Sequence, residues 1–131
     1  LRKEAKDLGV VVNFFGNIAN NQMPEIYNNY QIYVLCSHYE GNPKTLLEAM
    51  SCGCAVIGTD VPGIREVISH EVNGLLVSED KQSLHNEILR IYHDKPLSFK
   101  LGSEAVMHIE LNNSLKNAIL KEIQSYNLIL N

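Results

Sequence analysis

The sequence predicts an α/β fold in which helices cover both faces of a doubly wound parallel sheet. Short apolar runs alternate four times with segments of helical character. Successive positions within these runs are apolar, which is typical of strands buried on both faces. Alternation of strands and helices along a chain favours a parallel sheet. The chain contains no internal repeat and no low-complexity tract.

Four apolar runs predict the strands. Each is short, rich in apolar residues, and bounded by glycine or polar turn residues. The predicted strands cover residues 10–15, 32–37, 55–59 and 75–77. The loops that follow them, where ligands of such sheets bind, cover residues 16–22, 37–42, 59–63 and 78–79.

Signals at the helix ends predict four short helices among these strands. Gly9 follows the first helix at the position where glycine is favoured. Pro24 and Pro43 suit the first turns of the second and third helices. The fourth follows the turn at 60–63. The predicted ranges are 2–8, 24–29, 43–51 and 64–68.

Three further helices are predicted after the last strand. Asp80 is the expected N-cap of the first. Its expected apolar face, at helical spacing, carries Leu84, Ile88, Ile91 and Tyr92. The other two helices are expected over about 97–109 and 114–130.

The bulk composition describes one globular domain, or part of one. The 131 residues are 45% hydrophobic and 20% charged, with a net charge of −4 and no basic run. These values exclude wholesale disorder and argue against nucleic-acid binding through a basic face. No run of eighteen apolar residues and no signal peptide is visible. Because the chain begins without Met, in a segment of helical character, we expect it to be a piece of a longer protein.

The cysteines predict neither a disulfide framework nor a metal site. Cys36, Cys52 and Cys54 are an odd number. Cys52 and Cys54 lack a second His/Cys pair at ligand spacing. We therefore expect buried free thiols, as in a reducing cytosol, and no bound metal.

Two glutamates flank the start of the helix predicted at 43–51. Glu40 follows a strand end and Glu48 lies one to two turns into the helix. Backbone N–H groups at 44–46 lack intrahelical partners, so the helix start can bind a phosphate. A carboxylate can accept hydrogen bonds from two adjacent hydroxyls. The arrangement fits a sugar nucleotide, with its diphosphate between ribose and sugar. The spacing alone also fits a solvated helix residue and a loop charge.

The wider sequence resolves this choice through a family resemblance. The stretch SHYEGNPKTLLEAMSCGCAVIGTDVPGIREVISHEVNGLLV, residues 37–77, closely resembles the donor-binding half of family 4 (group 1) retaining glycosyltransferases of GT-B fold. The flanking runs VVVNFFGNI and IYNNYQIYVLCS are also similar, as is the region 114–130 with Tyr126. The resemblance implies a Rossmann-like C-terminal domain, truncated at its N-terminal edge, over residues 1–131 as a single partial domain.

The resemblance also implies the site residues. Glu40 matches a catalytic glutamate that contacts the donor sugar, and Glu48 matches the glutamate that binds the ribose hydroxyls. The diphosphate would lie against the residues that follow Glu40. The residues implied in sugar and diphosphate binding are Glu40, Gly41, Asn42, Lys44, Thr45 and Leu46. The implied nucleobase wall is Gly16, Asn17 and Ile18. No metal and no cofactor is expected.

The implied activity belongs to a full-length enzyme. It transfers a sugar of hexosyl type from a nucleotide-diphosphate sugar to an acceptor hydroxyl with retention, in cell-surface polysaccharide or glycolipid synthesis. The acceptor, a glycan or lipid-linked glycan, would bind an N-terminal domain that this chain lacks. We expect a cytoplasmic protein, and peripheral attachment to the inner face of the membrane stays open. A non-catalytic nucleotide-binding or structural module, or a GT-B relative such as a sugar-nucleotide epimerase, are the alternatives.

Two features depart from the family pattern. Pro43 stands where many relatives have glycine, and proline has no N–H to offer a phosphate. The family's Gly-Arg loop and Lys-Gly pair would lie upstream of residue 1. We therefore expect the isolated chain to be inactive.

Several other residues have a simpler explanation than ligand binding. His38 is expected as polar surface, and Ser37 as a cap of the loop. Gly63 is expected to serve turn geometry, with a donor contact as the alternative. The helix dipole favours Glu66 in a first turn.

Overall fold

The computed structural model describes residues 1–112. Within that range one sheet has three parallel strands in the order β1 (Ile32–Leu35), β2 (Ala55–Thr59) and β3 (Leu75–Val77). Tyr33 pairs with Val56, and Ile57 pairs with Leu75. The predicted α/β architecture with a parallel sheet is confirmed, and the last two strands have the predicted bounds.

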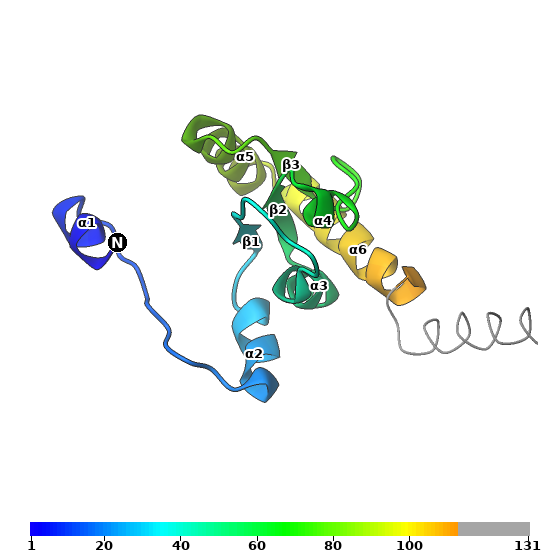
Figure 1. The fold of residues 1–131 in the computed structure, drawn as a ribbon, viewed down its shortest axis with the longest axis horizontal. Helices are drawn as coiled ribbons and strands as arrows, with labels where there is room; N and C mark the ends of the chain where they lie inside the picture. The colour runs from blue at the N-terminus through cyan, green and yellow to red at the C-terminus, as the bar shows by residue number, and fades with distance from the viewer. Residues whose placement is uncertain (113–131) are drawn as a thin grey trace, which may run out of the picture.

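Helices surround this sheet on both faces (Figure 1). The described helices are α1 (Arg2–Asp7), the 3₁₀ turn η1 (Asn20–Gln22), α2 (Met23–Asn28), α3 (Lys44–Ser51), α4 (Pro62–Arg65), α5 (Lys81–His93) and α6 (Lys95–Asn112). α2, α3 and α4 pack on one face, while α5 and much of α6 pack on the other. The predicted helix at 114–130, with Tyr126, lies outside the described residues.

Neighbouring residues of a strand belong to two separate apolar clusters, one on each face of the sheet. Val56 joins the cluster with Leu46 and Ile64, and Ile57 joins the cluster with Leu101 on the opposite face. Successive side chains of a strand point to opposite faces, so a strand covered on both sides must be apolar at every position. Every residue of β2 is buried.

The prediction of a strand at residues 10–15 is wrong. The segment is extended but unpaired, and Val11 is 91% exposed. Figure 1 shows it running away from the sheet towards α1. A β-rich sequence becomes a strand only where a neighbour supplies hydrogen-bond partners, and no described strand lies beside this run.

Other boundaries differ from the predictions by a few residues. β1 ends at Leu35, two residues early, and α4 covers 62–65 instead of 64–68. α6 begins at Lys95, two residues before the predicted start at about 97. Asp94 is the N-cap, because its side chain accepts a hydrogen bond of 2.9 Å from the Leu97 N–H.

Helix α5 begins as predicted. Asp80 accepts a hydrogen bond of 2.8 Å from the Ser83 N–H, so its role as N-cap is confirmed. Leu84 and Ile88 pack against the core beside the buried Ile91, whereas Tyr92 is 60% exposed and does not belong to the apolar face.

None of the helices in residues 1–112 has both the length and the apolar character that crossing a bilayer requires.

The cysteine prediction is correct in part. Cys54 is buried and Cys52 is half-buried, but Cys36 is exposed at the end of β1. All three thiols are free. Within the described part of the chain, no cluster of His, Cys, Asp and Glu is arranged to hold a metal ion.

Candidate functional site

The carboxyl ends of the three strands point to one edge of the sheet. The loop at 37–42 follows β1, the segment at 60–61 connects β2 to α4, and 78–80 connects β3 to α5. The parallel pairing places these segments side by side. This edge carries both Glu40 and the start of α3, as predicted for a sheet of this type.

A tight turn at Pro43 opens α3. Pro43 has φ −77° and ψ 66°, and the Lys44 N–H donates to the Asn42 carbonyl at 2.8 Å. These values define an inverse γ-turn. The Leu46 N–H donates to the Pro43 carbonyl at 3.0 Å. Two of the predicted phosphate donors therefore already have local partners.

The remaining donors at this edge are the N–H groups of Gly41, Asn42 and Thr45. No partner for them occurs within residues 1–112. All three residues are exposed. The γ-turn thus leaves free N–H groups on either side of Pro43, beside the positive end of the α3 dipole.

Glu48 is anchored from two sides. Its carboxylate accepts a hydrogen bond from the Tyr27 hydroxyl at 3.3 Å and pairs with the Lys44 ammonium at 3.6 Å. The Glu48 side chain remains 33% exposed. Burial, together with the nearby Tyr33 and the negative charge of Glu48, raises the pKa of Tyr27 well above its ordinary value. The Tyr27 hydroxyl therefore stays a donor to the carboxylate.

The charges of Glu40 and Glu48 both act on the hydroxyl of Tyr33. This hydroxyl donates to the Thr45 hydroxyl at 2.8 Å, at the start of α3. Burial raises the pKa of Tyr33, the bond to Thr45 lowers it, and the charges of Glu40 and then Glu48 raise it further. Glu40 precedes α3 by four residues and Glu48 lies in its second turn, so the two predicted carboxylates flank one helix start. Unlike Glu48, the half-buried Glu40 has no side-chain hydrogen bond or ion pair with another described residue.

Gly63 packs closely against the backbone of Glu40. A Cβ at Gly63 would lie 2.0 Å from the Glu40 carbonyl oxygen and 2.7 Å from its carbonyl carbon. Gly63 does not have a positive φ, unlike Gly9 and Gly53. The expectation that it serves turn geometry is therefore wrong, because what requires glycine here is space for another backbone.

The predicted nucleobase wall is only partly connected to this edge. Ile18 and Phe15 line an apolar hollow of about 380 Å³ that extends to Tyr33 and Thr45. Gly16 and Asn17 do not line it. The hollow also borders Ile32, on the edge strand β1.

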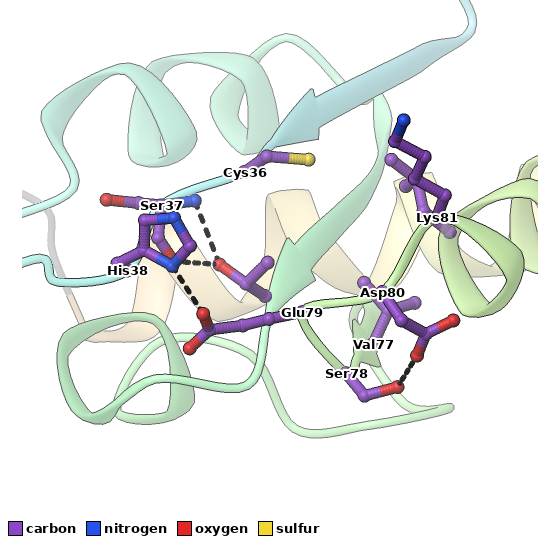
Figure 2. A pocket seen from close by; sticks show the side chains of 10 residues that line it. Cys36, Ser37, His38, Val77, Ser78, Glu79, Asp80 and Lys81 are labelled. Atoms are coloured by element: carbon purple, nitrogen blue, oxygen red, sulfur yellow. Dashed lines mark hydrogen bonds and ion pairs between the residues drawn. The ribbon is translucent and has the colours of Figure 1, made fainter.

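A second hollow, of about 210 Å³, lies at the strand ends (Figure 2). Its lining comes from the ends of all three strands and the start of α5: Cys36, Ser37, His38, Thr59, Val77, Ser78, Glu79, Asp80, Lys81 and Leu84. His38 Nδ1 and Glu79 Oε2 form a hydrogen bond between the β1 and β3 ends. This hollow borders the 37–42 loop but contains neither Glu40 nor Glu48.

Three further residues, Tyr27, Thr59 and Glu79, take part in these contacts and are not predicted from the sequence. Tyr27 is one of six tyrosines and carries no local signal. Thr59 and Glu79 stand at strand ends, in loops already predicted to form the ligand edge. Position relative to a strand was therefore the available signal for those two residues.

Comparison with known sequences places this edge in a family. Residues 1–107 match the family described as Glycosyl transferases group 1. The chain is 37% identical over 76 residues to the UDP-N-acetylglucosamine--peptide N-acetylglucosaminyltransferase GtfA subunit of Streptococcus parasanguinis, covering 57% of this chain and 15% of that protein. It is 33% identical over 88 residues to N,N'-diacetylbacillosaminyl-diphospho-undecaprenol alpha-1,3-N-acetylgalactosaminyltransferase of Campylobacter jejuni, covering 66% and 23% respectively. The chain thus spans less than a quarter of either relative.

Superposition on solved structures agrees with this family assignment. Sucrose-phosphate synthase from Thermosynechococcus elongatus superposes with a TM-score of 0.87 at 26% identity, over 98% of this chain and 33% of that one. The C-terminal domain of the glycosyl transferase group 1 family protein LpcC from Francisella tularensis superposes with a TM-score of 0.75 at 26% identity, over 87% and 60%. The predicted GT-B relationship is confirmed. The chain belongs to the Glycosyl transferases group 1 family.

Proposed function

We propose that this chain is the donor-binding part of a retaining glycosyltransferase that uses a nucleotide-diphosphate sugar. The observation that carries the proposal is that Glu40 and Glu48 flank the start of α3, with free N–H groups at Gly41, Asn42 and Thr45. Two carboxylates suit hydroxylated rings, and the N–H groups between them suit a diphosphate.

The helix start would stabilise the leaving group. When the glycosidic bond to the donor phosphate breaks, negative charge develops on the diphosphate oxygens. N–H groups already aimed at that position require no reorganisation during the reaction. Lys44, 68% exposed and 3.6 Å from Glu48, adds positive charge at the same helix start. The site is proposed to work without a metal ion.

Glu48 would bind the ribose hydroxyls. Its bond to Tyr27 fixes the carboxylate from the core side and leaves the remaining oxygen positions for the ligand. The ribose hydroxyls take no part in bond breaking, so their contact with Glu48 changes little between ground state and transition state. This contact therefore contributes mainly uniform binding.

Glu40 would orient the donor sugar. Its carboxylate has no partner among the described side chains, so it is available to sugar hydroxyls. Its negative charge would also support the positive charge that develops at the anomeric carbon. The acceptor hydroxyl would attack on the face from which the phosphate departs, which gives retention.

The acceptor would bind in a separate N-terminal domain of the whole protein. The two curated relatives are named for a peptide acceptor and for a saccharide on diphospho-undecaprenol. We propose a glycan or lipid-linked glycan acceptor, a hexosyl donor, a role in polysaccharide or glycolipid synthesis, and a cytoplasmic site of action with peripheral contact at the membrane.

Calorimetric titration with UDP, GDP and ADP tests the proposal. The protein containing this chain should bind one of these nucleotides, and Glu48→Ala should weaken that binding, whereas Glu87→Ala on α5 should not. No heat with any nucleotide at millimolar concentration would overturn it. Product analysis with the matching nucleotide sugar should find the sugar on the acceptor. Release of an epimerised sugar instead would identify an epimerase, and binding without any product would identify a nucleotide-binding module.

A further inference from the structure

The segment 59–63, from the end of β2 to the first turn of α4, lies directly against the loop 37–42. We infer that Thr59 and Gly63 are positioning residues, which hold this loop in the shape that presents Glu40 and the free N–H groups to the donor. The inference rests on the proposed function and adds two residues that contact the loop and not the ligand.

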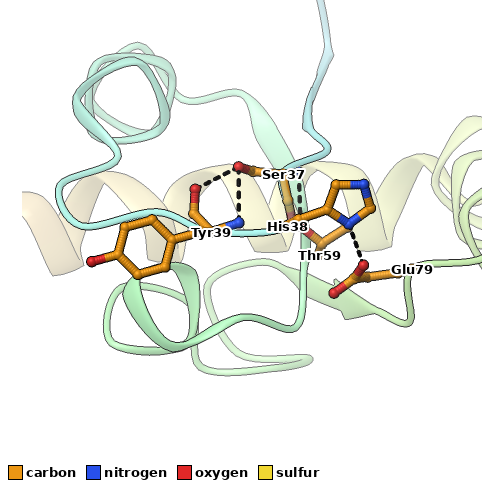
Figure 3. A network of polar contacts seen from close by, with 5 residues as sticks. All are labelled: Ser37, His38, Tyr39, Thr59 and Glu79. Carbon is orange, nitrogen blue, oxygen red and sulfur yellow. Dashed lines mark hydrogen bonds and ion pairs between the residues drawn. The ribbon is translucent and has the colours of Figure 1, made fainter.

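Thr59 fixes the beginning of the loop. Its hydroxyl accepts a hydrogen bond from the Ser37 N–H at 3.0 Å and donates one to the Ser37 carbonyl at 2.6 Å (Figure 3). The backbone pairing of β1 and β2 ends at Leu35 and Gly58. The Thr59 side chain, only 5% exposed, therefore satisfies both backbone groups of Ser37 after the ladder has ended.

Ser37 in turn hydrogen-bonds the backbone of Tyr39, further along the loop. Its hydroxyl donates to the Tyr39 carbonyl at 2.7 Å, and the same oxygen lies 3.4 Å from the Tyr39 N–H. Figure 3 shows these bonds continuing from the Thr59 contact, while the Tyr39 ring points away from the network. The backbone is thus held at Ser37 and Tyr39, which lie three positions and one position before Glu40.

Gly63 fixes the position of Glu40 itself. A Cβ there would meet the Glu40 carbonyl oxygen at 2.0 Å, its carbonyl carbon at 2.7 Å and its Cβ at 3.4 Å. Two of these atoms are backbone and cannot turn aside as the end of a long side chain can. Any larger residue must displace Glu40, and with it the N–H of Gly41.

A loop restrained at Ser37, Tyr39 and Glu40 loses little entropy when the donor binds. Binding groups must be held close to their productive geometry for a reaction to be fast, and a misplacement of about 1 Å can cost roughly 100-fold in rate. Displacement of Glu40 should therefore lower kcat more than it weakens binding of the nucleotide, which Glu48 contacts separately.

Four variants of the protein that contains this chain test the inference. Thr59→Val removes the hydroxyl at nearly constant volume, and Thr59→Ser restores it. Gly63→Ala introduces the clash with Glu40. Gly102→Ala is its matched control, because a Cβ at Gly102 in α6 would lie 2.2 Å from the Gly53 carbonyl oxygen, a similar clash that does not involve the loop.

The measurements are donor kinetics per folded molecule and hydrogen exchange of the Ser37–Gly41 amides. Thr59→Val should speed exchange at Ser37 and lower kcat at least about tenfold, with a smaller change in donor KM. Thr59→Ser should recover most of kcat and most of the protection from exchange at Ser37. Gly63→Ala should lower kcat, whereas Gly102→Ala should not. If Gly63→Ala fails to fold, the Thr59 pair alone decides.

Unchanged kcat and unchanged exchange in Thr59→Val would overturn the inference. Equal losses of kcat in Gly63→Ala and Gly102→Ala would also overturn it, since both would then reflect general destabilisation. Failure of the proposed function has a different signature, because the wild-type protein would neither bind nor turn over a nucleotide sugar. The exchange measurement would still show whether Thr59 and Gly63 hold the loop.

Discussion

The Tyr27 hydroxyl of α2 donates a hydrogen bond of 3.3 Å to the Glu48 carboxylate of α3. Tyr27 is 5% exposed, whereas the Glu48 side chain is 33% exposed. The bond therefore joins a core residue to a partly exposed carboxylate. Part of the Glu48 carboxylate is thus hydrogen-bonded from within the protein, although its neighbours Leu46, Ala49 and Met50 in α3 are apolar and buried.

A double-mutant cycle measures this bond. Tyr27→Phe and Glu48→Gln should each lower the free energy of unfolding, with a coupling of about 0.5–1 kcal/mol. The value is below the about 1.5–3 kcal/mol that is usual for a charged partner, because solvent reaches Glu48. Urea unfolding at neutral pH gives the four free energies. Tyr30→Phe, at an exposed tyrosine, should show no coupling to Glu48→Gln.

Alkaline pH should destabilise the protein through Tyr27. Its pKa in the folded state is raised, so above about pH 10, the ordinary tyrosine pKa, the unfolded state loses this proton first. The unfolded state then binds fewer protons, and the free energy of unfolding falls as pH rises towards the folded pKa. Stability of the wild type should fall more steeply than that of Tyr27→Phe between about pH 10 and 11.5. Parallel curves across that range would refute the prediction.

Glu48→Ala should raise the donor KM more than it lowers kcat. Loss of hydrogen bonds to a carboxylate costs about 1.5–3 kcal/mol, which corresponds to roughly a ten- to hundredfold change in KM. Steady-state kinetics with varied donor concentration measures both constants. Glu48→Gln keeps the shape and should fall between wild type and alanine. An unchanged donor KM in Glu48→Ala would count against ribose binding.

Glu40→Ala should act mainly on kcat. The carboxylate is proposed to stabilise charge at the anomeric carbon, and removal of one such group typically costs about 100-fold. Donor KM should change much less. Glu87→Ala, which removes a carboxylate paired with Arg90 on α5, is the control and should leave both constants unchanged. Full activity in Glu40→Ala would remove its catalytic assignment.

Asp80→Ala should lower the free energy of unfolding by about 1 kcal/mol through loss of the α5 N-cap. Asp80→Asn keeps an oxygen for the Ser83 N–H and should cost less. Hydrogen bonds from Ser78 and from the Ser83 N–H hold the pKa of Asp80 below its ordinary value. Thermal or urea unfolding measures the difference, and equal losses in both variants would contradict the capping role.

Local signals predicted much of the fold. Turn residues around apolar runs predicted β2 and β3 to the residue, and Asp80 predicted the start of α5. These features depend on residues within a few positions of one another. The run at 10–15 has equally strong β character but is unpaired, because pairing depends on a neighbour that the run itself does not specify.

Apart from the nucleobase wall expected at 16–18, the predicted site residues come from one continuous stretch, Glu40 to Glu48, and from its family resemblance. What holds that stretch in place comes from elsewhere in the chain. Pro43 was recognised as lacking an N–H, but the γ-turn it forms decides which neighbouring N–H groups stay free. That outcome depends on backbone angles, which the residue types alone leave open.

By itself, the sequence determined the type of fold and the order of the three strands that form the sheet, and it marked the two glutamates on either side of the α3 start. Only the tertiary structure decided how that site is held. Tyr27 reaches Glu48 across 21 residues, and Thr59 reaches Ser37 across 22. Gly63 leaves room for the Glu40 backbone. Such contacts arise when separate segments pack against one another, so no pattern within any one segment contains them.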